Sequence, residues 1–349
     1  MGRRLTVGQE GTSNNAPTNG IVLAGPGDPA STSVTHVVYG RRCIIESEDL
    51  RAEIDPEVGA SLTDLSVRGP GGAWWPLLRR SSSALSGGEE SSCYLLAPWS
   101  NRVRDGRFAF EGREVSLRKN WPDGTAIHGD VRDREWRILD RSPVSARLAF
   151  SSIEFEDINW PWAFRAQARY ELATSGLESE LVITNASDRP MPCGGGFHPF
   201  FNRILWDTAD DPVVTAAVTG RYPCEGVMAV GPAAMDDFCR SLVGGSDVRA
   251  PLDDVFSCPS GRVGILWPAS GVAVEFESSH ELGHLVIYSA VGSGGTPRPH
   301  LCVEPVSMVN DGFNLASRGA VNDHGVRVLA PGGSLRLKWT MRILRSKGS

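Results

Sequence analysis

Short runs in which apolar and polar residues alternate, separated by turn residues, recur along most of this chain and limit its possible folds. They include RFAFEG, FRAQARYELA, VAVEF and SLRLKWTMRI. An alternation with a period of two places apolar side chains on one face of a β-strand, whereas a helix needs a period near 3.6. The chain also has 39 glycines and 23 prolines, which supply many turns. We therefore predict an all-β protein, built as a large antiparallel sandwich of two sheets.

The beginning of the chain differs in composition from the rest. Residues 1–34 are rich in Gly, Ser, Thr, Asn and Pro, which predicts a flexible arm. From residue 35 to residue 349, no low-complexity break and no repeat of fixed period interrupts the pattern of strands. We predict one β domain there.

Charge and cysteine content exclude several classes of partner. The net charge of −6 gives no reason to expect binding to nucleic acid or to an acidic membrane surface. No apolar run reaches the roughly 18 residues of a membrane span, and no apolar segment follows the two N-terminal arginines. Seven scattered cysteines without a C-x-x-C pair favour reduced thiols. These features predict a cytoplasmic protein that is not inserted in a membrane.

The sequence HELGH at residues 280–284 matches the H-E-x-x-H pattern of zinc peptidases. On a helix, His280 and His284 would share a face and ligate zinc, Glu281 would activate the bound water, and Glu304 could be the third ligand. The flanking residues argue against a helix, because VAVEF alternates and LVIY is β-branched and aromatic. Gly283 would also weaken a helix by about 1 kcal/mol. We predict a turn between two strands and keep the zinc peptidase as an alternative.

Polar residues interrupt the strand pattern at a few places where they could carry out chemistry. His198 follows three glycines and precedes a proline and two phenylalanines, which could fix an imidazole away from water; a structural histidine bonded to a carbonyl is the alternative. Glu304 emerges from the apolar run LCV, which is costly unless it is functional or paired with an arginine. Asp253 and Asp254 follow Pro251 and could be turn residues.

Five motifs in order, SNRVRDGRF, AIHGD, GFHPFFN, LDDVF and CVEP, followed by VLAPGGSLRLKW, resemble the aldose 1-epimerase (galactose mutarotase) family from about residue 40 onward. The resemblance implies a β-supersandwich with an open cleft for a free monosaccharide, without metal or cofactor. It implies that Glu304 is the general base and His198 the general acid. The sugar contacts that it implies are Arg102, His128 and Asp253, with Asn101 as a supporting contact.

The function that follows from the resemblance is mutarotation, the interconversion of the α and β anomers of a free aldose. A sugar-binding protein without catalysis, built on the same fold, is the alternative. The expected form is a monomer or a homodimer. Trp99, Trp160 and Trp162 are candidates for stacking on a sugar, although tryptophans more often lie in the core. The glycines at 194–196 depart from the best-known galactose mutarotases, and we find no arginine set for a sugar phosphate.

Overall fold

The structure is a computed structural model that describes residues 42–345, apart from residues 83, 207–210, 249–250, 293 and 320. The predicted flexible arm at residues 1–34 lies outside the described residues. The first residues of the predicted β domain, 35–41, lie outside them as well.

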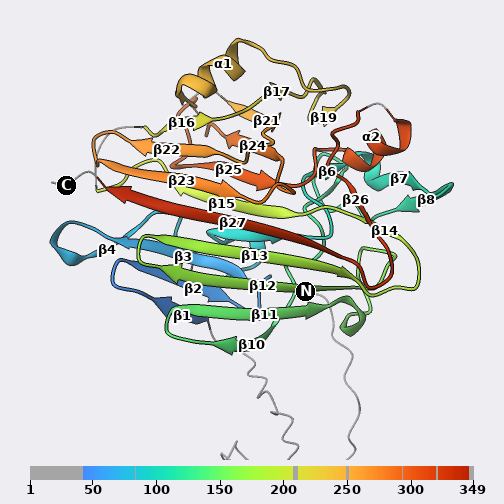
Figure 1. Cartoon of the computed structure of the whole chain (residues 1–349), viewed down its shortest axis with the longest axis horizontal. Helices are drawn as coiled ribbons and strands as arrows, with labels where there is room; N and C mark the ends of the chain where they lie inside the picture. The colour runs from blue at the N-terminus through green and yellow to red at the C-terminus, as the bar shows by residue number, and fades with distance from the viewer. Residues whose placement is uncertain are drawn as a thin grey trace, which may run out of the picture.

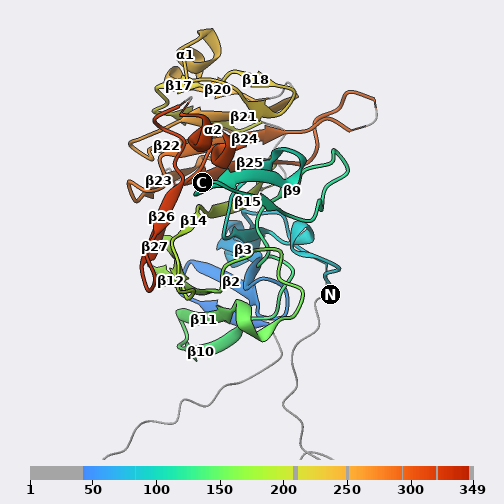
Figure 2. The same cartoon turned by 90° about the vertical axis from the view of Figure 1, so that its right-hand side faces the viewer.

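Two large antiparallel sheets make up most of the molecule, which confirms the predicted all-β sandwich (Figures 1 and 2). The ten-stranded sheet contains, in spatial order, β1 (Cys43–Glu46), β2 (Leu50–Asp55), β3 (Ser61–Arg68), β5 (Cys93–Leu96), β15 (Gly196–Asn202), β25 (His300–Val306), β24 (His284–Ser289), β21 (Leu252–Ser257) and β17 (Gly220–Arg221), and β4 (Trp74–Pro76) pairs with β3. The nine-stranded sheet contains β10 (Arg137–Arg141), β11 (Ser145–Ser151), β12 (Phe164–Ala173), β13 (Gly176–Asn185), β27 (Ser334–Arg345), β23 (Val272–Ser278), β22 (Val263–Trp267), β16 (Val213–Ala216) and β20 (Ser246–Asp247).

Shorter elements lie around these sheets. Four strand pairs are β6 (Arg102–Val103) with β9 (Ala126–Ile127), β7 (Arg107–Phe110) with β8 (Arg113–Ser116), β14 (Met191–Cys193) with β26 (Arg327–Leu329), and β18 (Cys224–Glu225) with β19 (Met228–Ala229). The helices are α1 (Asp237–Gly244), α2 (Gly312–Arg318) and the 3₁₀ turns η1 (Pro70–Gly72), η2 (Gly88–Glu90), η3 (Arg104–Gly106) and η4 (Ser152–Glu154). Within the described residues, no helix has the length and apolarity needed to cross a bilayer.

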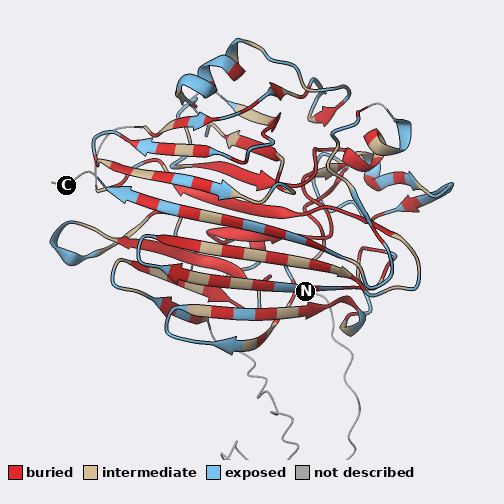
Figure 3. Ribbon diagram, viewed as in Figure 1, coloured by how far each residue is buried: buried red, intermediate tan, exposed pale blue. Residues whose placement is uncertain are grey.

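The core lies between the two sheets. In β27 the alternation predicted from SLRLKWTMRI buries Leu335, Leu337, Trp339 and Met341, whereas most of the intervening side chains face solvent. Figure 3 shows the same alternation along β12 and β27 of the nine-stranded sheet. This sheet therefore has one face against the core and one face in water.

The central strands of the ten-stranded sheet are buried on both faces, unlike those of the partner sheet. Strands β15 and β25 are buried along nearly their whole length (Figure 3). One face packs on the core, and the other carries a second apolar cluster that includes Tyr94, Phe200 and Cys302. Polar side chains on this second face are thus shielded from water, and the candidate site lies there.

Candidate active site

Side chains from five neighbouring strands line up on the second face of the ten-stranded sheet. Residues that lie opposite each other in an antiparallel sheet point to the same side, so the register of the strands decides which side chains meet. His198 falls opposite Glu304, between the pairs Gly196–Val306 and Phe200–Cys302. Two rows cross the face: the first contains Tyr94, His198, Glu304, Val286 and Val255, and the second contains Phe200, Cys302, Tyr288 and Asp253.

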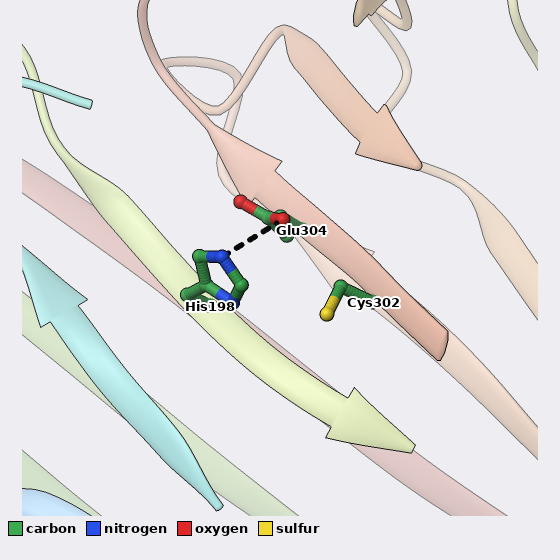
Figure 4. Close-up of side chains that lie close together, drawn as sticks. All are labelled: His198, Cys302 and Glu304. Carbon is green, nitrogen blue, oxygen red and sulfur yellow. Dashed lines mark ion pairs between the residues drawn. The ribbon is translucent and has the colours of Figure 1, made fainter. Parts of the chain in front are cut away.

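His198 and Glu304 form a direct contact at the centre of the first row. Nε2 of His198 lies 3.2 Å from Oε1 of Glu304, and the two side chains are only 8% and 2% exposed (Figure 4). A glycine next to this pair allows the close approach of β15 to β25, because a Cβ atom at Gly196 would lie 2.6 Å from the carbonyl oxygen of Pro305. The structure therefore brings together the two residues predicted to be the acid and the base.

Aromatic rings hold the imidazole of His198 in place. The rings of Tyr94 and Phe200 stack against it, with centroids 4.4 Å and 4.7 Å from its own. Nδ1 of His198 is buried and has no hydrogen-bond partner in the described structure, and Nε2 faces Glu304 and not a carbonyl oxygen. Likewise, Glu304 contacts this histidine and not an arginine. Packing against Tyr94 and Phe200 therefore helps to orient the His198 ring.

Burial favours the neutral forms of both residues. It raises the pKa of Glu304 well above its usual range; Asp253 adds to this effect and Arg102 opposes it. Burial also lowers the pKa of His198 well below its usual range, and Arg79 acts in the same direction. When both groups are neutral, the carboxylic acid carries one proton that it can transfer to the imidazole across the 3.2 Å contact between Oε1 and Nε2. The pair can therefore move one proton without gaining or losing net charge.

Arg102 contacts several acidic and amide groups and acts on Glu304 through its charge. Its Nη1 lies 3.4 Å from Oδ2 of Asp253 and 3.3 Å from Oδ1 of Asn101, and its Nε donates to Asp123 at 2.9 Å. Asp253 lies in β21, and not in a turn as its position after Pro251 allowed. Burial raises the pKa of the Asp253 carboxyl, and Arg102 opposes this rise. Arg102 and the acidic side chains around it can hold several sugar hydroxyls by charge-assisted hydrogen bonds.

The predicted contacts Asn101 and His128 lie side by side because β6 pairs with β9. The backbone N–H of His128 donates to the carbonyl oxygen of Asn101 at 3.0 Å. Both residues adopt left-handed backbone conformations, with φ of 53° at Asn101 and 63° at His128, which are uncommon for residues other than glycine. The ring of His128 lies edge-on to that of His198, with centroids 5.1 Å apart. Such backbone strain often occurs at functional sites.

Tyr288 and Asp123 are two polar residues of the site that were not predicted from the sequence. Tyr288 lies between Asp253 and Cys302 in the second row, is half-buried, and its hydroxyl has no hydrogen-bond partner among the described residues. Asp123 lies in the turn after Trp121 and Pro122 and binds Arg102. Tyr288 could have been found from the alternation within HLVIYS, because Val286 and Tyr288 share a face of their strand.

The three candidate tryptophans do not reach the site. Trp99, Trp160 and Trp162 are buried in the main core and pack on one another. The aromatic rings next to the acid and base are those of Tyr94 and Phe200. All seven cysteines are free, and six of them are buried.

The HELGH sequence leads from β23 into β24: its first residues form a turn, as the flanking residues predicted, and His284 is the first residue of β24. His280 is 79% exposed, and its Nδ1 lies 3.0 Å from Oε1 of Glu281. His284 is buried, where its Nδ1 bonds with the carbonyl oxygen of Ser307 at 2.9 Å and its Nε2 with the hydroxyl of Tyr222 at 3.0 Å. The helical face that an H-E-x-x-H zinc site requires does not form at these residues, so the geometry does not support the zinc peptidase alternative.

The two histidines of HELGH should differ strongly in their effect on stability. We expect His284→Ala to lower the free energy of unfolding by about 2 to 4 kcal/mol, because it leaves a cavity and unpaired buried polar groups. The control variant His280→Ala removes an exposed ring and should change it by no more than about 0.5 kcal/mol. Urea unfolding of both variants measures the difference. Equal losses in the two variants would contradict the assignment.

The chain is similar to known proteins over most of its length. A sequence model of the family described as aldose 1-epimerase matches residues 43–341. The uncharacterized protein YphB of Escherichia coli K12 is 25% identical over 265 residues, which cover 73% of this chain and 84% of YphB.

Solved structures with the same fold align with most of this chain. A galactose mutarotase-like protein from Clostridium acetobutylicum aligns with a TM-score of 0.74 and 20% identity, over 87% of this chain and 95% of that chain. A GalM/aldose epimerase homologue from C. elegans aligns with a TM-score of 0.73 and 16% identity, over 88% of this chain and 100% of that chain. These likenesses show that the sandwich described above is shared with those proteins.

Proposed function

This chain belongs to the aldose 1-epimerase family, which confirms the resemblance seen in its motifs, and we propose that it is a mutarotase acting on a free aldose. The observation that carries the proposal is the buried contact of 3.2 Å between His198 and Glu304. A general acid and a general base held side by side are what catalysis of the ring opening of a hemiacetal needs.

Ring opening requires a base and an acid at the same time. We propose that the Glu304 carboxylate accepts the proton of the C1 hydroxyl, while His198 donates a proton from Nε2 to the ring oxygen. The bond between C1 and the ring oxygen breaks as the C1 carbonyl forms. Rotation about the bond from C1 to C2, followed by the reverse transfers, closes the ring as the other anomer.

The proton count of the pair fits this reaction. Without sugar, burial favours a neutral carboxylic acid and a neutral imidazole. Transfer of that proton from Glu304 to His198 produces the reactive carboxylate and imidazolium. Arg102, which acts to lower the pKa of Glu304, stabilises this charged form. No proton has to be exchanged with solvent during a cycle, because closure returns the transferred proton.

The groups around the pair would position the sugar. Arg102 and His128 can donate hydrogen bonds to sugar oxygens, and Asp253 can accept one from a hydroxyl. Asn101 supports Arg102 through its Oδ1 atom. Holding the ring oxygen near His198 and the C1 hydroxyl near Glu304 makes both transfers intramolecular, which accounts for much of the acceleration in reactions of this type.

Polarimetry of freshly dissolved α-D-glucose and α-D-galactose, with and without the purified protein, tests the proposal. EDTA is present in all samples, so that adventitious metal does not contribute. We expect the optical rotation to reach equilibrium faster with the protein for at least one sugar. Binding of both sugars without acceleration would favour a non-catalytic sugar-binding protein.

Removal of the Tyr288 hydroxyl should weaken the reaction moderately. We expect Tyr288→Phe to lower kcat/KM by about 2- to 10-fold, as the loss of one hydrogen bond to a sugar hydroxyl would do. The thermal midpoint should not change, because this hydroxyl has no hydrogen-bond partner among the described residues. Unchanged kcat/KM for every accepted sugar would show that Tyr288 does not contact the substrate.

A further inference from the structure

The side chains of His198, Cys302 and Glu304, three residue types that can ligate metal ions, lie close together in the site (Figure 4). One ligand atom each of His198, Cys302 and Glu304 lies within 4.8 Å of the other two, and all three residues are buried. Cys302 and Glu304 are two residues apart on β25 and so share a face, and His198 lies opposite Glu304 on β15. Among the described residues, no other group of three or more His, Cys, Asp or Glu side chains has this spacing.

We propose that His198, Cys302 and Glu304 bind a soft divalent cation such as Zn²⁺, and that the bound ion inhibits ring opening. Imidazole, thiolate and carboxylate are all zinc ligands, and three protein ligands leave a fourth position for water or a sugar hydroxyl. Inhibition follows because the metal would use the atoms of His198 and Glu304 that must exchange protons with the sugar. The inhibitory part of this inference rests on the proposed function, whereas the binding part does not.

The spacing of the ligands is compatible with a tetrahedral ion. The bond lengths of zinc to nitrogen, oxygen and sulfur place neighbouring ligand atoms about 3.3 to 3.6 Å apart. The 3.2 Å between Nε2 of His198 and Oε1 of Glu304 is already close to this value. The sulfur of Cys302, within 4.8 Å, needs to approach by at most about 1.2 Å, a shift that rotation about its Cα–Cβ bond can supply.

Charge balance makes a buried dication acceptable at this position. Cys302 and Glu304 both lie buried at the site, and each binds a metal ion in its deprotonated form. Metal binding displaces one proton from each of them. The thiolate and the carboxylate then neutralise both charges of the ion, and His198 binds as a neutral ring. The affinity should therefore increase with pH.

The surroundings of the ligands indicate reversible binding and not a resident metal. In resident sites, the second ring nitrogen of a histidine ligand usually donates to a carbonyl or carboxylate. Nδ1 of His198 is buried without such a partner in the described structure, because stacking against Tyr94 and Phe200 orients the ring. Within the described part of the chain, the His198 ligand thus lacks the outer hydrogen bond to Nδ1 that would strengthen metal binding.

Titration of the full chain with Cd²⁺ tests the site without any sugar. A cadmium thiolate absorbs in the ultraviolet by charge transfer. We expect a band that corresponds to one Cd–thiolate bond per chain, and we expect Zn²⁺ to remove the band by displacing Cd²⁺. Cys302→Ser should abolish the band. The matched control Cys258→Ser removes another buried cysteine, whose Sγ contacts the carbonyl oxygen of Ala217, and should leave the band intact. Glu304→Gln retains the thiol and should weaken Cd²⁺ binding at least tenfold, which provides a second test if Cys302→Ser does not fold.

The inhibitory part is tested by mutarotation with increasing Zn²⁺, followed by excess EDTA. We expect reversible inhibition, and at least tenfold lower sensitivity in Cys302→Ser when each protein is compared with its own metal-free rate. Absence of the Cd²⁺ band, or a band that persists in Cys302→Ser, overturns the inference even if the protein is an active mutarotase. A band that depends on Cys302 in a protein inactive on every sugar supports the metal site and contradicts the proposed function.

Discussion

Glu304→Gln is expected to lower kcat/KM for mutarotation by about 10²- to 10⁴-fold, the usual contribution of a general base. Glutamine has nearly the same shape as a protonated glutamate but cannot accept the proton of the C1 hydroxyl. Burial favours the neutral form of Glu304, so the neutral amide should be tolerated in its place. Polarimetry measures the loss, and isothermal titration calorimetry measures whether sugar binding is retained.

Two outcomes would decide against this role of Glu304. A variant that keeps more than a tenth of the activity would show that another group removes the proton. A variant that no longer binds sugar would show that Glu304 mainly holds the substrate. An unchanged thermal midpoint serves as the control that the variant is folded, because the substitution changes neither the volume nor the charge expected at this position.

His198→Asn is expected to cause a loss of similar size, because the ring oxygen must receive a proton as its bond to C1 breaks. Asparagine can still donate a hydrogen bond, but it cannot transfer a proton near neutral pH. The two residues act in the same step, so the double variant with Glu304→Gln should lose little more than either single variant. Polarimetry of the three proteins measures this coupling.

His280→Ala is the control for the histidine substitution, because its ring is exposed on the HELGH turn and far more accessible than that of His198. Its activity should equal that of the unmodified protein. If the loss of kcat/KM in the double variant equals the product of the losses in the two single variants, His198 and Glu304 act in separate steps. This result would contradict the shared proton that we propose.

The sequence was sufficient to predict the fold and the turn at HELGH. Period-two alternation in SLRLKWTMRI reappears as the buried and exposed residues of β27, because each side chain of a strand faces either the core or water. The same argument identified strands on both sides of HELGH, and they are β23 and β24. These inferences need only local sequence, which is why they could be made without a structure.

The site could be predicted only in part. The motifs pointed to His198 and Glu304, but the contact between them depends on the register of β15 and β25, which are more than 90 residues apart in the chain and which no local pattern fixes. Cys302 was considered only as part of the apolar run before Glu304. The spacing of the two residues on one strand was the available signal that they share a face.

Long-range pairing also explains the residues that were missed. Tyr288 enters the site because β24 lies between β21 and β25, which places it between Asp253 and Cys302. Asp123 reaches Arg102 from a turn whose position depends on the pairing of β6 with β9. Contacts of this kind follow from how distant segments pack and not from the residues next to them.

The most direct test of the account is exchange NMR on a panel of free aldoses at anomeric equilibrium, with EDTA, for the unmodified protein and for Glu304→Gln. This measurement reports the interconversion of the two anomers itself and does not depend on how the sugar was dissolved. The account predicts faster exchange for at least one aldose with the unmodified protein and an exchange rate close to the spontaneous one with Glu304→Gln. Equal acceleration by both proteins, or no acceleration of any aldose, would contradict it.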